Sequence, residues 1–194
     1  MEIKKILNFF KMNKYERSLS ICRNTYALLN KKKFSKIGKK SYFMKPIFLS
    51  GTQHIEMGED VGIWHNARVE VIDEWKGKGF SPRLKFGNHI NIGQDLHIAC
   101  AEDIVIEDNV LISSGVFITD LSHVTDDYEK AVVEQGIITK PVKICEGTFI
   151  GKDSMIMPGV TLGKHCVVGA NAVVTKDVAD FTTVAGVPAR VIHR

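Results

Sequence analysis

The side chains that could do chemistry in this chain are chiefly its seven histidines and four cysteines, and their spacing argues against a bound metal. The cysteines are scattered and form no CxxC pair, so neither a disulfide framework nor a zinc site is expected. No glycine-rich loop of the Walker or dinucleotide type is present, so neither ATP nor NAD is implied. A neutral imidazole, by contrast, titrates near neutral pH and can take the proton of a hydroxyl nucleophile.

The elements that must position such a group fit within one domain. The chain has 194 residues, of which 44% are hydrophobic and 25% charged, as in a soluble globular protein with a small appendage. No apolar run approaches the ~18 residues of a membrane-spanning helix. The apolar stretch near the start of the sequence is too short and too polar for the core of a secretory leader. We therefore expect a protein of the reducing cytoplasm.

The net charge of +4 is unevenly distributed along the chain. Residues 1–40 hold twelve Lys or Arg and two Glu, whereas residues 41–194 hold fourteen basic and twenty acidic residues. Residues 1–40 therefore carry a net charge of +10 and residues 41–194 one of −6. A basic head of this kind is either the solvated face of a helix or a surface that contacts an anionic membrane leaflet, at the inner face of the cell membrane. Nucleic acid is not an expected partner.

A six-residue period runs through most of the chain. Every sixth residue from Met57 onward is apolar, with three breaks, and Gly follows six of these fifteen positions. The fifteen are Met57, Ile63, Val69, Phe86, Ile92, Ile98, Ile106, Ile112, Ile118, Ile144, Ile150, Ile156, Leu162, Val168 and Val174. Such a period is typical of a repeat whose units bury a continuous core only when they stack.

Six residues suit a short strand followed by a tight corner, where Gly relieves an unusual backbone angle. Three such sides close a triangular coil, so fifteen hexads predict five stacked coils about 24 Å long. The sequence therefore predicts an all-β fold, a parallel β-helix.

The period also sets the expected organisation of the chain. Residues 1–40 lack it and show helical spacing of apolar residues, at Ile3, Ile6, Leu7 and Phe10 and again at Leu19, Cys22, Tyr26 and Leu29. They are expected to form one or two basic helices and a Lys-rich linker. The β-helix domain should span residues 41–194, opening on an entry strand or irregular turn over 41–56. Insertions interrupt it at 75–85 and 124–143, residues 104–105 are a two-residue slip, and 180–194 form a C-terminal tail.

Two stretches carry a family resemblance. Residues 144–174, ICEGTFIGKDSMIMPGVTLGKHCVVGANAVV, continue as TKDVADFTTVAGVPARVI. This pattern resembles the C-terminal signature of hexapeptide-repeat acyltransferases, which include galactoside, maltose and serine acetyltransferases. The segments SGTQHIEMGEDVGIWHNARVEVID, INIGQDLHIA and VFITDLSH resemble sugar O-acetyltransferases of capsule, exopolysaccharide and O-antigen clusters. The resemblance implies a left-handed β-helix, and acetyl-CoA as cosubstrate in polysaccharide biosynthesis.

The resemblance also implies a catalytic histidine at the mouth of the long loop. That place is taken by His123, in the segment ITDLSH. Many relatives read Asp-His-x-His here; this chain has Leu121 in place of the first histidine and keeps the second, to which the catalytic role maps. His123 would act as general base on a sugar hydroxyl, and Asp120 or Asp95 would orient its imidazole. A backbone N–H would meet the developing oxyanion.

The cofactor residues implied by the resemblance lie in the last two coils. They are Gly151 and Lys152 in Ile-Gly-Lys, Ala170 in Gly-Ala-Asn, Thr175 and Lys176 in Val-Thr-Lys-Asp, and Arg190 in Pro-Ala-Arg. Lys176 and Arg190 are charged donors suited to phosphate, although exposed lysines are more often simply solvated.

The residues expected to contact the acceptor lie in two earlier corners of the predicted coils. Asp95 lies where relatives often carry an Asn that faces the sugar, so it would either read a hydroxyl or assist His123. Trp64 and Asn66 form a polar and aromatic corner, in which the Trp would either stack on a sugar or pack against the fold.

Several readings remain open at this stage. N-acylation of a nucleotide-linked or lipid-linked amino sugar uses the same prism and cofactor site. A non-catalytic trimeric scaffold is a weaker alternative. A zinc hydratase on this fold needs two histidines five residues apart, and no pair here has that spacing. Family members are usually homotrimers, so we expect a C3 trimer with active sites between subunits.

Overall fold

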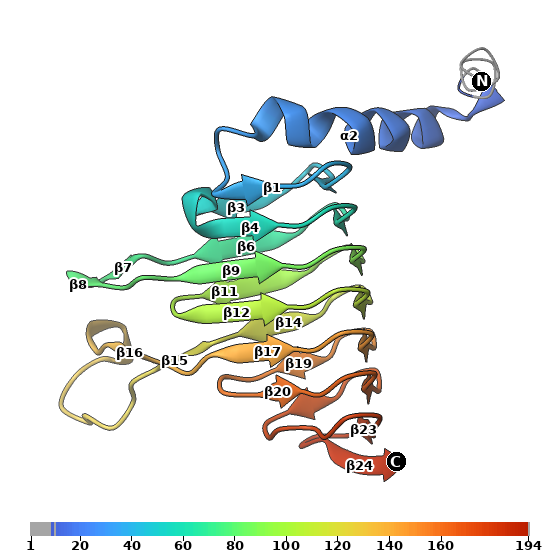
Figure 1. Cartoon of the computed structure of the whole chain (residues 1–194). Coiled ribbons are helices and arrows are strands. Elements are labelled where there is room, and N and C mark those ends of the chain that lie inside the picture. Colours follow the sequence, from blue (N-terminus) through green and yellow to red (C-terminus); the bar gives the residue numbers. More distant parts are fainter. Residues whose placement is uncertain (1–8, 10, 194) are drawn as a thin grey trace.

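The computed structural model describes residues 9 and 11–193, and it contains one long helix across the end of a three-sided column of strands (Figure 1). The expected first helix, with Ile3, Ile6, Leu7 and Phe10, lies outside the described residues. Within the described residues, no helix is long and apolar enough to cross a lipid bilayer.

Each side of the column is a parallel sheet, and strands from successive coils stack in register. Sheet A comprises β1 (Lys36–Ile37), β4 (Ile55–Met57), β9 (Arg83–Phe86), β12 (Asp103–Ile106), β17 (Val142–Ile144) and β20 (Thr161–Leu162). Sheet B comprises β2 (Tyr42–Phe43), β5 (Gly62–Ile63), β10 (Asn91–Ile92), β13 (Leu111–Ile112), β18 (Phe149–Ile150), β21 (Val167–Val168), β23 (Thr183–Ala185) and the antiparallel β24 (Arg190–His193). Sheet C comprises β3 (Phe48–Ser50), β6 (Arg68–Val71), β11 (His97–Cys100), β14 (Phe117–Thr119), β19 (Met155–Ile156) and β22 (Val173–Val174). The predicted parallel β-helix is confirmed.

The column has six full coils, one more than the five predicted. The additional coil is the first one, in which Ile37, Phe43 and Leu49 take the inward hexad positions of β1, β2 and β3. Because β1 pairs with β4, the column begins before the predicted boundary at residue 40, and part of the expected Lys-rich linker is a strand. The expected tail likewise contributes β23 and β24 to sheet B.

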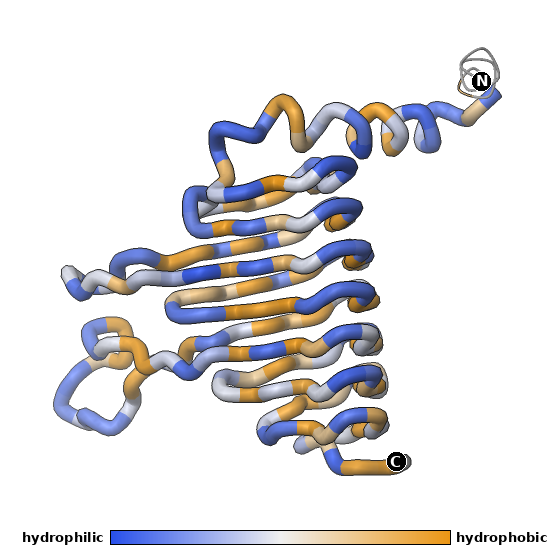
Figure 2. Tube along the Cα trace, viewed as in Figure 1, coloured by the Kyte–Doolittle hydropathy of each residue, from blue (hydrophilic) through white to orange (hydrophobic). Residues whose placement is uncertain are grey.

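The core is a single stack of inward side chains that runs the length of the column. All fifteen predicted hexad residues are buried, and so are the small or apolar residues four positions later, such as Val61, Val116 and Ala172. In sheet A, β4, β9, β12 and β17 bury two residues each, for example Ile104 and Ile106 in β12. The two-residue slip falls in β12, where Ile104 lies six residues after Ile98 and Ile106 starts the hexads of the next coil. Alternating hydropathy along the trace is visible in Figure 2.

Two of the three corners are regular. At the corner from sheet A to sheet B (the A–B corner) each coil places one residue in the left-handed backbone region, and at the corner from B to C (the B–C corner) each coil after the first does so. The N–H of that residue donates to a carbonyl of the coil above, as Asn109 does to Asn88 and Asp153 to Ser114. These corner residues are Lys40, Asp60, His89, Asn109, Gly147, His165 and Phe181 at A–B, and Asn66, Asp95, Gly115, Asp153 and Asn171 at B–C.

The third corner, from sheet C to sheet A (the C–A corner), is irregular and carries both insertions. The first forms a hairpin of β7 (Glu74–Trp75) and β8 (Lys78–Gly79). The second, called the arm below, pairs β15 (Leu121–His123) with β16 (Ile137–Thr139) and includes the 3-10 turn η2 (Val132–Glu134). Another 3-10 turn, η1 (Thr52–His54), lies at this corner in the first coil. Hairpin and arm project from the same side of the column (Figure 1).

Helix α2 (Lys14–Asn30) closes the amino-terminal end of the column. It begins with a capping box in which Asn13 and Glu16 exchange side-chain to backbone hydrogen bonds of 2.9 Å. Its inner face meets β2, where Tyr26 packs against Phe34 and Phe43 of the core. The helix thereby covers the first coil, whose apolar interior would otherwise face solvent.

Candidate active site

His123 is the last residue of β15 and stands exposed at the root of the arm. Its place is fixed by the pairing of β15 with β16, where it lies opposite Ile137. Among residues 9 and 11–193, no hydrogen bond or ion pair is recorded for its ring, so both nitrogens are available to a ligand. An exposed imidazole held at the base of a two-stranded arm can act as a general base on a molecule bound beside it.

Within the described chain, the ring that packs against His123 is that of Trp75, from the other insertion. The two ring centroids lie 5.4 Å apart in an edge-on arrangement of 61°. The indole Nε1 is buried and has no hydrogen-bond partner within the described chain. Trp75 was not among the site residues expected from the sequence. The signal was present, however, since both insertions leave the column at the same corner and Trp75 begins the first of them.

Asp120 lies fully buried at the base of the arm. Its carboxylate accepts hydrogen bonds from the backbone N–H groups of Ala101 and Glu102, at 2.8 and 2.9 Å. Burial raises the pKa of this carboxyl, and the two N–H donors act against that rise. No Asp120–His123 hydrogen bond is recorded in the described residues. Asp120 fastens the arm to the preceding coil, which differs from the predicted contact with the imidazole.

The predicted acceptor residues Asn66 and Asp95 lie at the B–C corner. Both adopt the left-handed conformation and both are exposed. Their backbone N–H groups donate to Pro46 and His65 of the coils above, at 2.6 and 3.1 Å. Sheet C separates this corner from the C–A corner, so within one chain Asp95 and His123 lie at different corners of the column.

Trp64 sits near Asn66 in sequence but has its indole directed elsewhere. Nε1 donates to Asn91 Oδ1 at 3.1 Å, and the ring centroid lies 6.2 Å from that of Tyr15 in the first turn of α2. The structure therefore gives Trp64 a packing role where the helix meets sheet B.

Three of the predicted cofactor residues continue the B–C corner below Asp95. Gly151 and Lys152 belong to the fifth coil and Ala170 to the sixth. A Cβ on Gly151 would lie 2.6 Å from the Ala170 backbone nitrogen, so this position must lack a side chain. Lys152 forms an ion pair with Asp153. The corner is thus flat at Gly151 and bordered by charge.

The remaining predicted cofactor residues are exposed and lie near the carboxyl-terminal end of the column. Thr175 and Lys176 follow β22 at the C–A corner, and Arg190 begins β24, where its guanidinium donates to the Ala189 carbonyl at 2.9 Å. No ion pair involves Lys176 or Arg190 in the described chain. Two cations therefore remain available to an anionic ligand. The described residues contain no cluster of His, Cys, Asp and Glu that could hold a metal ion.

Comparison with known proteins agrees with this architecture. The bacterial transferase hexapeptide family (six repeats) matches residues 141–176. A Mycobacterium tuberculosis protein named as an acetyltransferase is 34% identical over 133 residues, which are 69% of this chain and 43% of that protein. Escherichia coli WbbJ, named as a lipopolysaccharide biosynthesis O-acetyl transferase, is 28% identical over 77% of this chain and 76% of its own length. The chain thus spans less than half of the mycobacterial relative.

Solved structures share the fold. AntD of Bacillus cereus, an N-acyltransferase in complex with dTDP and 3-hydroxybutyryl-CoA, superposes with a TM-score of 0.75 at 21% identity over 89% of each chain. A hexapeptide-repeat acetyltransferase of Vibrio cholerae, complexed with acetyl-CoA, gives 0.61 at 27% identity over 91% of this chain and 82% of that one. The predicted left-handedness of the β-helix is thereby confirmed.

Proposed function

The chain belongs to the hexapeptide-repeat transferases, and on that premise we propose that it transfers the acetyl group of acetyl-CoA to a hydroxyl of a sugar or glycan unit. The observation that carries the proposal is His123, an exposed imidazole with free nitrogens at the root of an arm that interrupts the repeat. Sugar-directed relatives such as WbbJ support the acceptor class and a role in polysaccharide biosynthesis.

In the proposed reaction, the cosubstrate supplies the acetyl group as an activated thioester. His123 accepts the proton of the acceptor hydroxyl as that oxygen attacks the thioester carbonyl carbon. The carbon–sulfur bond breaks, and the imidazolium returns the proton to the departing thiolate. The imidazole ends neutral, and the products are an acetyl ester and the free thiol. A backbone N–H would stabilise the oxyanion that develops.

Trp75 acts as a positioning residue in this scheme. Its edge-on contact restricts rotation of the His123 ring, which otherwise has no recorded bond to hold it. The unpartnered Nε1–H beside the ring is a donor that the bound substrates can satisfy. Asp120 supports the same geometry by holding the root of the arm.

The cofactor would lie along the column toward its carboxyl-terminal end. Lys176 and Arg190 would hold its phosphates, with Lys152 as a further cation. Gly151, Ala170 and Thr175 would form the flat surface against which its arm lies. The absence of a side chain at Gly151 and the unpaired cations suit an elongated, phosphate-bearing ligand.

Assembly would complete the site. Because Asp95 and His123 lie at different corners of one chain, a site that uses both needs two chains. Leu111, Phe149 and Val167 stack on adjacent strands of sheet B and are all exposed, which is the character of a contact surface. We propose a C3 homotrimer in which Asp95 of one chain faces His123 of the next and either orients its ring or reads the acceptor, with Asn66 and Trp64 nearby. Sedimentation showing an active monomer would contradict it.

N-acylation of an amino sugar is the second candidate, and the likeness to AntD favours it. The two reactions differ in the bond that forms. An O-acetyl product is hydrolysed by mild alkali, whereas an amide survives.

The test is an assay of the purified chain with labelled acetyl-CoA and a panel of sugars, amino sugars and lipid-linked glycans. We expect an alkali-labile product from a hydroxyl acceptor, identified by mass and NMR. An alkali-stable product would support the N-acyl alternative. Absence of acetyl-CoA binding by calorimetry would contradict both and leave the scaffold reading. The unpaired cysteines of the described chain suit a reducing cytoplasm, where the reaction is proposed to occur.

A further inference from the structure

The amino-terminal end of the column carries a second surface, formed by α2 and the turns that follow it. Between Glu16 and Glu56 the chain holds nine basic residues and no acidic one. They are Arg17, Arg23, Lys31, Lys32, Lys33, Lys36, Lys39, Lys40 and Lys45. We refer to this part of the molecule as the basic end.

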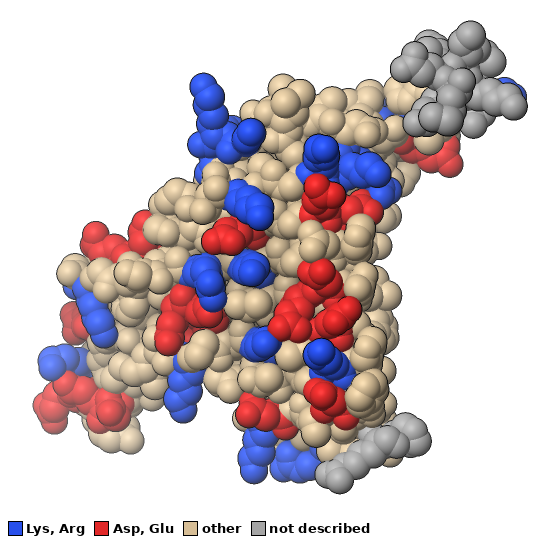
Figure 3. Space-filling view, viewed as in Figure 1, with Lys and Arg blue, Asp and Glu red and all other residues tan. Residues whose placement is uncertain are grey.

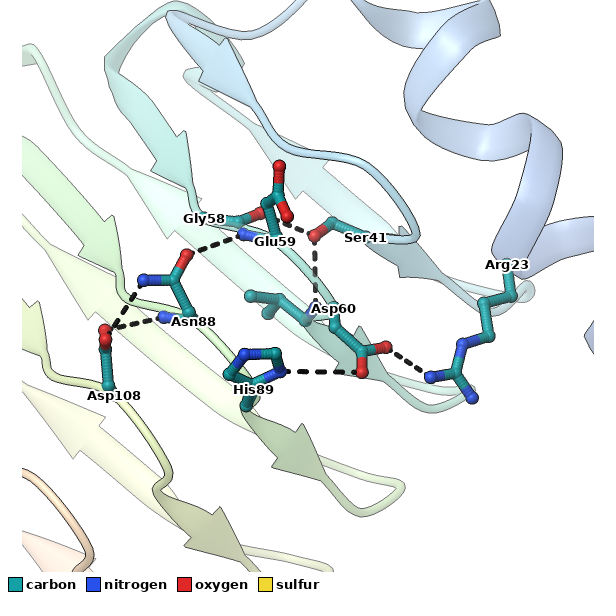
Figure 4. Close-up of polar contacts among 9 residues, drawn as sticks. Arg23, Ser41, Gly58, Glu59, Asp60, Asn88, His89 and Asp108 are labelled. Carbon is teal, nitrogen blue, oxygen red and sulfur yellow. Dashed lines mark hydrogen bonds and ion pairs between the residues drawn. The ribbon is translucent and has the colours of Figure 1, made fainter.

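The inner face of α2 is fixed to the column, and so the outward face is defined. Arg23 Nη2 pairs with Asp60 Oδ1 at 2.6 Å, and His89 reaches the other oxygen of Asp60 at 3.7 Å (Figure 4). Cys22 Sγ lies 3.7 Å from the Phe43 carbonyl oxygen, and the Tyr26 ring packs against the Phe43 ring. The helix therefore cannot rotate without breaking an ion pair and uncovering the core.

The outward face combines apolar side chains with cations. Ile21 and Leu28 are 53% and 77% exposed, whereas Leu29, 75% exposed, lies seven residues from Cys22 and so at the edge of the inner face. Ile21 and Leu28 are seven residues apart and so lie on one face of the helix, and Arg17 and Lys31 project on the same side. Single exposed apolar residues need no explanation, but two on one helix face beside exposed cations do.

The charge of this surface is uncompensated. Of its nine basic residues, only Arg23 forms an ion pair within the described chain. Sheet A, by contrast, mixes both signs, as in the Arg83–Asp103 and Lys143–Glu107 pairs (Figure 3). Eight of the nine basic residues thus form no ion pair within the described chain, and the acidic residues beside them, Glu59 and Asp60, belong to the second coil.

We propose that the basic end binds the surface of an anionic lipid bilayer, with α2 lying in the plane of the interface. Ile21 and Leu28 enter the boundary between headgroups and acyl chains, and the lysines meet the lipid phosphates. A nucleic acid would use the cations but leave the apolar side chains in water. A second copy of this face would bring like charges together. The column stands away from the bilayer, so its corners stay open to solvent.

The test is flotation of the full chain with vesicles of 30% phosphatidylglycerol in phosphatidylcholine, with pure phosphatidylcholine vesicles alongside. We expect binding to the anionic vesicles alone, and loss of binding in high salt. The Lys31→Gln/Lys32→Gln double variant should bind about 30-fold more weakly. Ile21→Ser/Leu28→Ser should bind about tenfold more weakly, since it removes the apolar contribution.

The matched control is Lys85→Gln/Lys164→Gln, which removes two exposed charges from the column and should bind as the unaltered chain does. Circular dichroism should show all variants folded, because none of the changed side chains is buried. Equal binding by the two lysine variants would reduce the effect to net charge and overturn the proposal. So would equal binding to neutral vesicles, or tighter binding to an RNA oligonucleotide that persists in the Ile21→Ser/Leu28→Ser variant. Deleting residues 1–40 is not a suitable test, because Phe34 and Ile37 belong to the core.

Discussion

The A–B and C–A corners of the same column differ in almost every respect. The A–B corner repeats one left-handed residue per coil and one backbone hydrogen bond to the coil above. At the C–A corner Lys140 donates to the Asp120 carbonyl and Gly159 to the Lys140 carbonyl, but of these three residues only Gly159 is left-handed. The turns there range from the two residues between β11 and β12 to the long arm. Both corners lie over the same apolar core. Chain can therefore be inserted at the C–A corner without disturbing the stacking of the coils.

This difference separates stability from chemistry. At the A–B corner, side chains such as Asn88 and Asp108 close the ladder by bonding to each other and to the backbone (Figure 4). At the C–A corner, Trp75 and His123 come from two insertions that the repeat does not require. Changes at the regular corner should lower stability, and changes at the irregular corner should lower activity.

The largest expected effect is that of His123→Ala. Loss of a general base should reduce kcat by 10²- to 10⁴-fold, whereas the melting temperature should stay within about 1 °C because the side chain is exposed. Steady-state assay and calorimetry give the two values. His165→Asn is the control, since His165 occupies a left-handed A–B position that Asn tolerates. Near-normal turnover by His123→Ala would end the assignment.

Gly87→Ala should have the next largest effect, on stability. The new Cβ would overlap the Asp108 carboxylate and lie 2.8 Å from the Asp108 nitrogen, so the next coil must shift. We expect a loss of about 3 kcal/mol, or roughly 10 °C in melting temperature. Gly136→Ala, in the arm, meets no atom within 4 Å and should be neutral. If both variants unfold alike in denaturant titration, the two corners do not differ as described.

Trp75→Ala should lower kcat by about tenfold with little change in the KM for acetyl-CoA, because the imidazole loses its packing partner but the cofactor residues are untouched. Trp75→Phe should recover much of the rate through ring packing alone, and the remaining difference measures the Nε1–H donor. The split between kcat and KM is the readout, since a merely structural role would not lower kcat at an unchanged KM. A variant that alters only thermal stability would assign Trp75 to the fold.

The smallest effects should appear in the pH dependence of stability, with opposite signs at the two corners. Hydrogen bonds from Asn88 lower the pKa of Asp108, so its contribution is present above the ordinary carboxyl range and is lost as the pH falls through the folded-state pKa. Burial raises the pKa of Asp120, so its contribution is present at low pH and is lost as the pH rises. Each should amount to about 1 kcal/mol or less. Urea unfolding between pH 7 and 3 of Asp108→Asn and Asp120→Asn should change the slope in opposite directions.

The repeat region was predictable because each hexad buries its own residue. All fifteen inward positions identified from the period are buried, the two insertions emerge at the C–A corner, and the slip lies in the strand that follows it, β12. The first coil was missed although Ile37, Phe43 and Leu49 keep the period. Basic residues surround them, and the step from Leu49 to Met57 is eight residues instead of six, so these three positions do not fall in line with the later hexads. That step is the same slip seen at residues 104–105, so the pattern itself contained the correction.

The sequence by itself determined the column, its three-sided period and the corner at which its insertions emerge, since these follow from local alternation and the size of a hexad. It also placed His123 at the root of the longest insertion. Only the tertiary structure decided what meets at that place. Trp75 reaches His123 across 48 residues of sequence, and Asp120 turns inward to hold the backbone. It also decided which side of α2 faces water. Such contacts depend on how separate coils stack, and no local period encodes them.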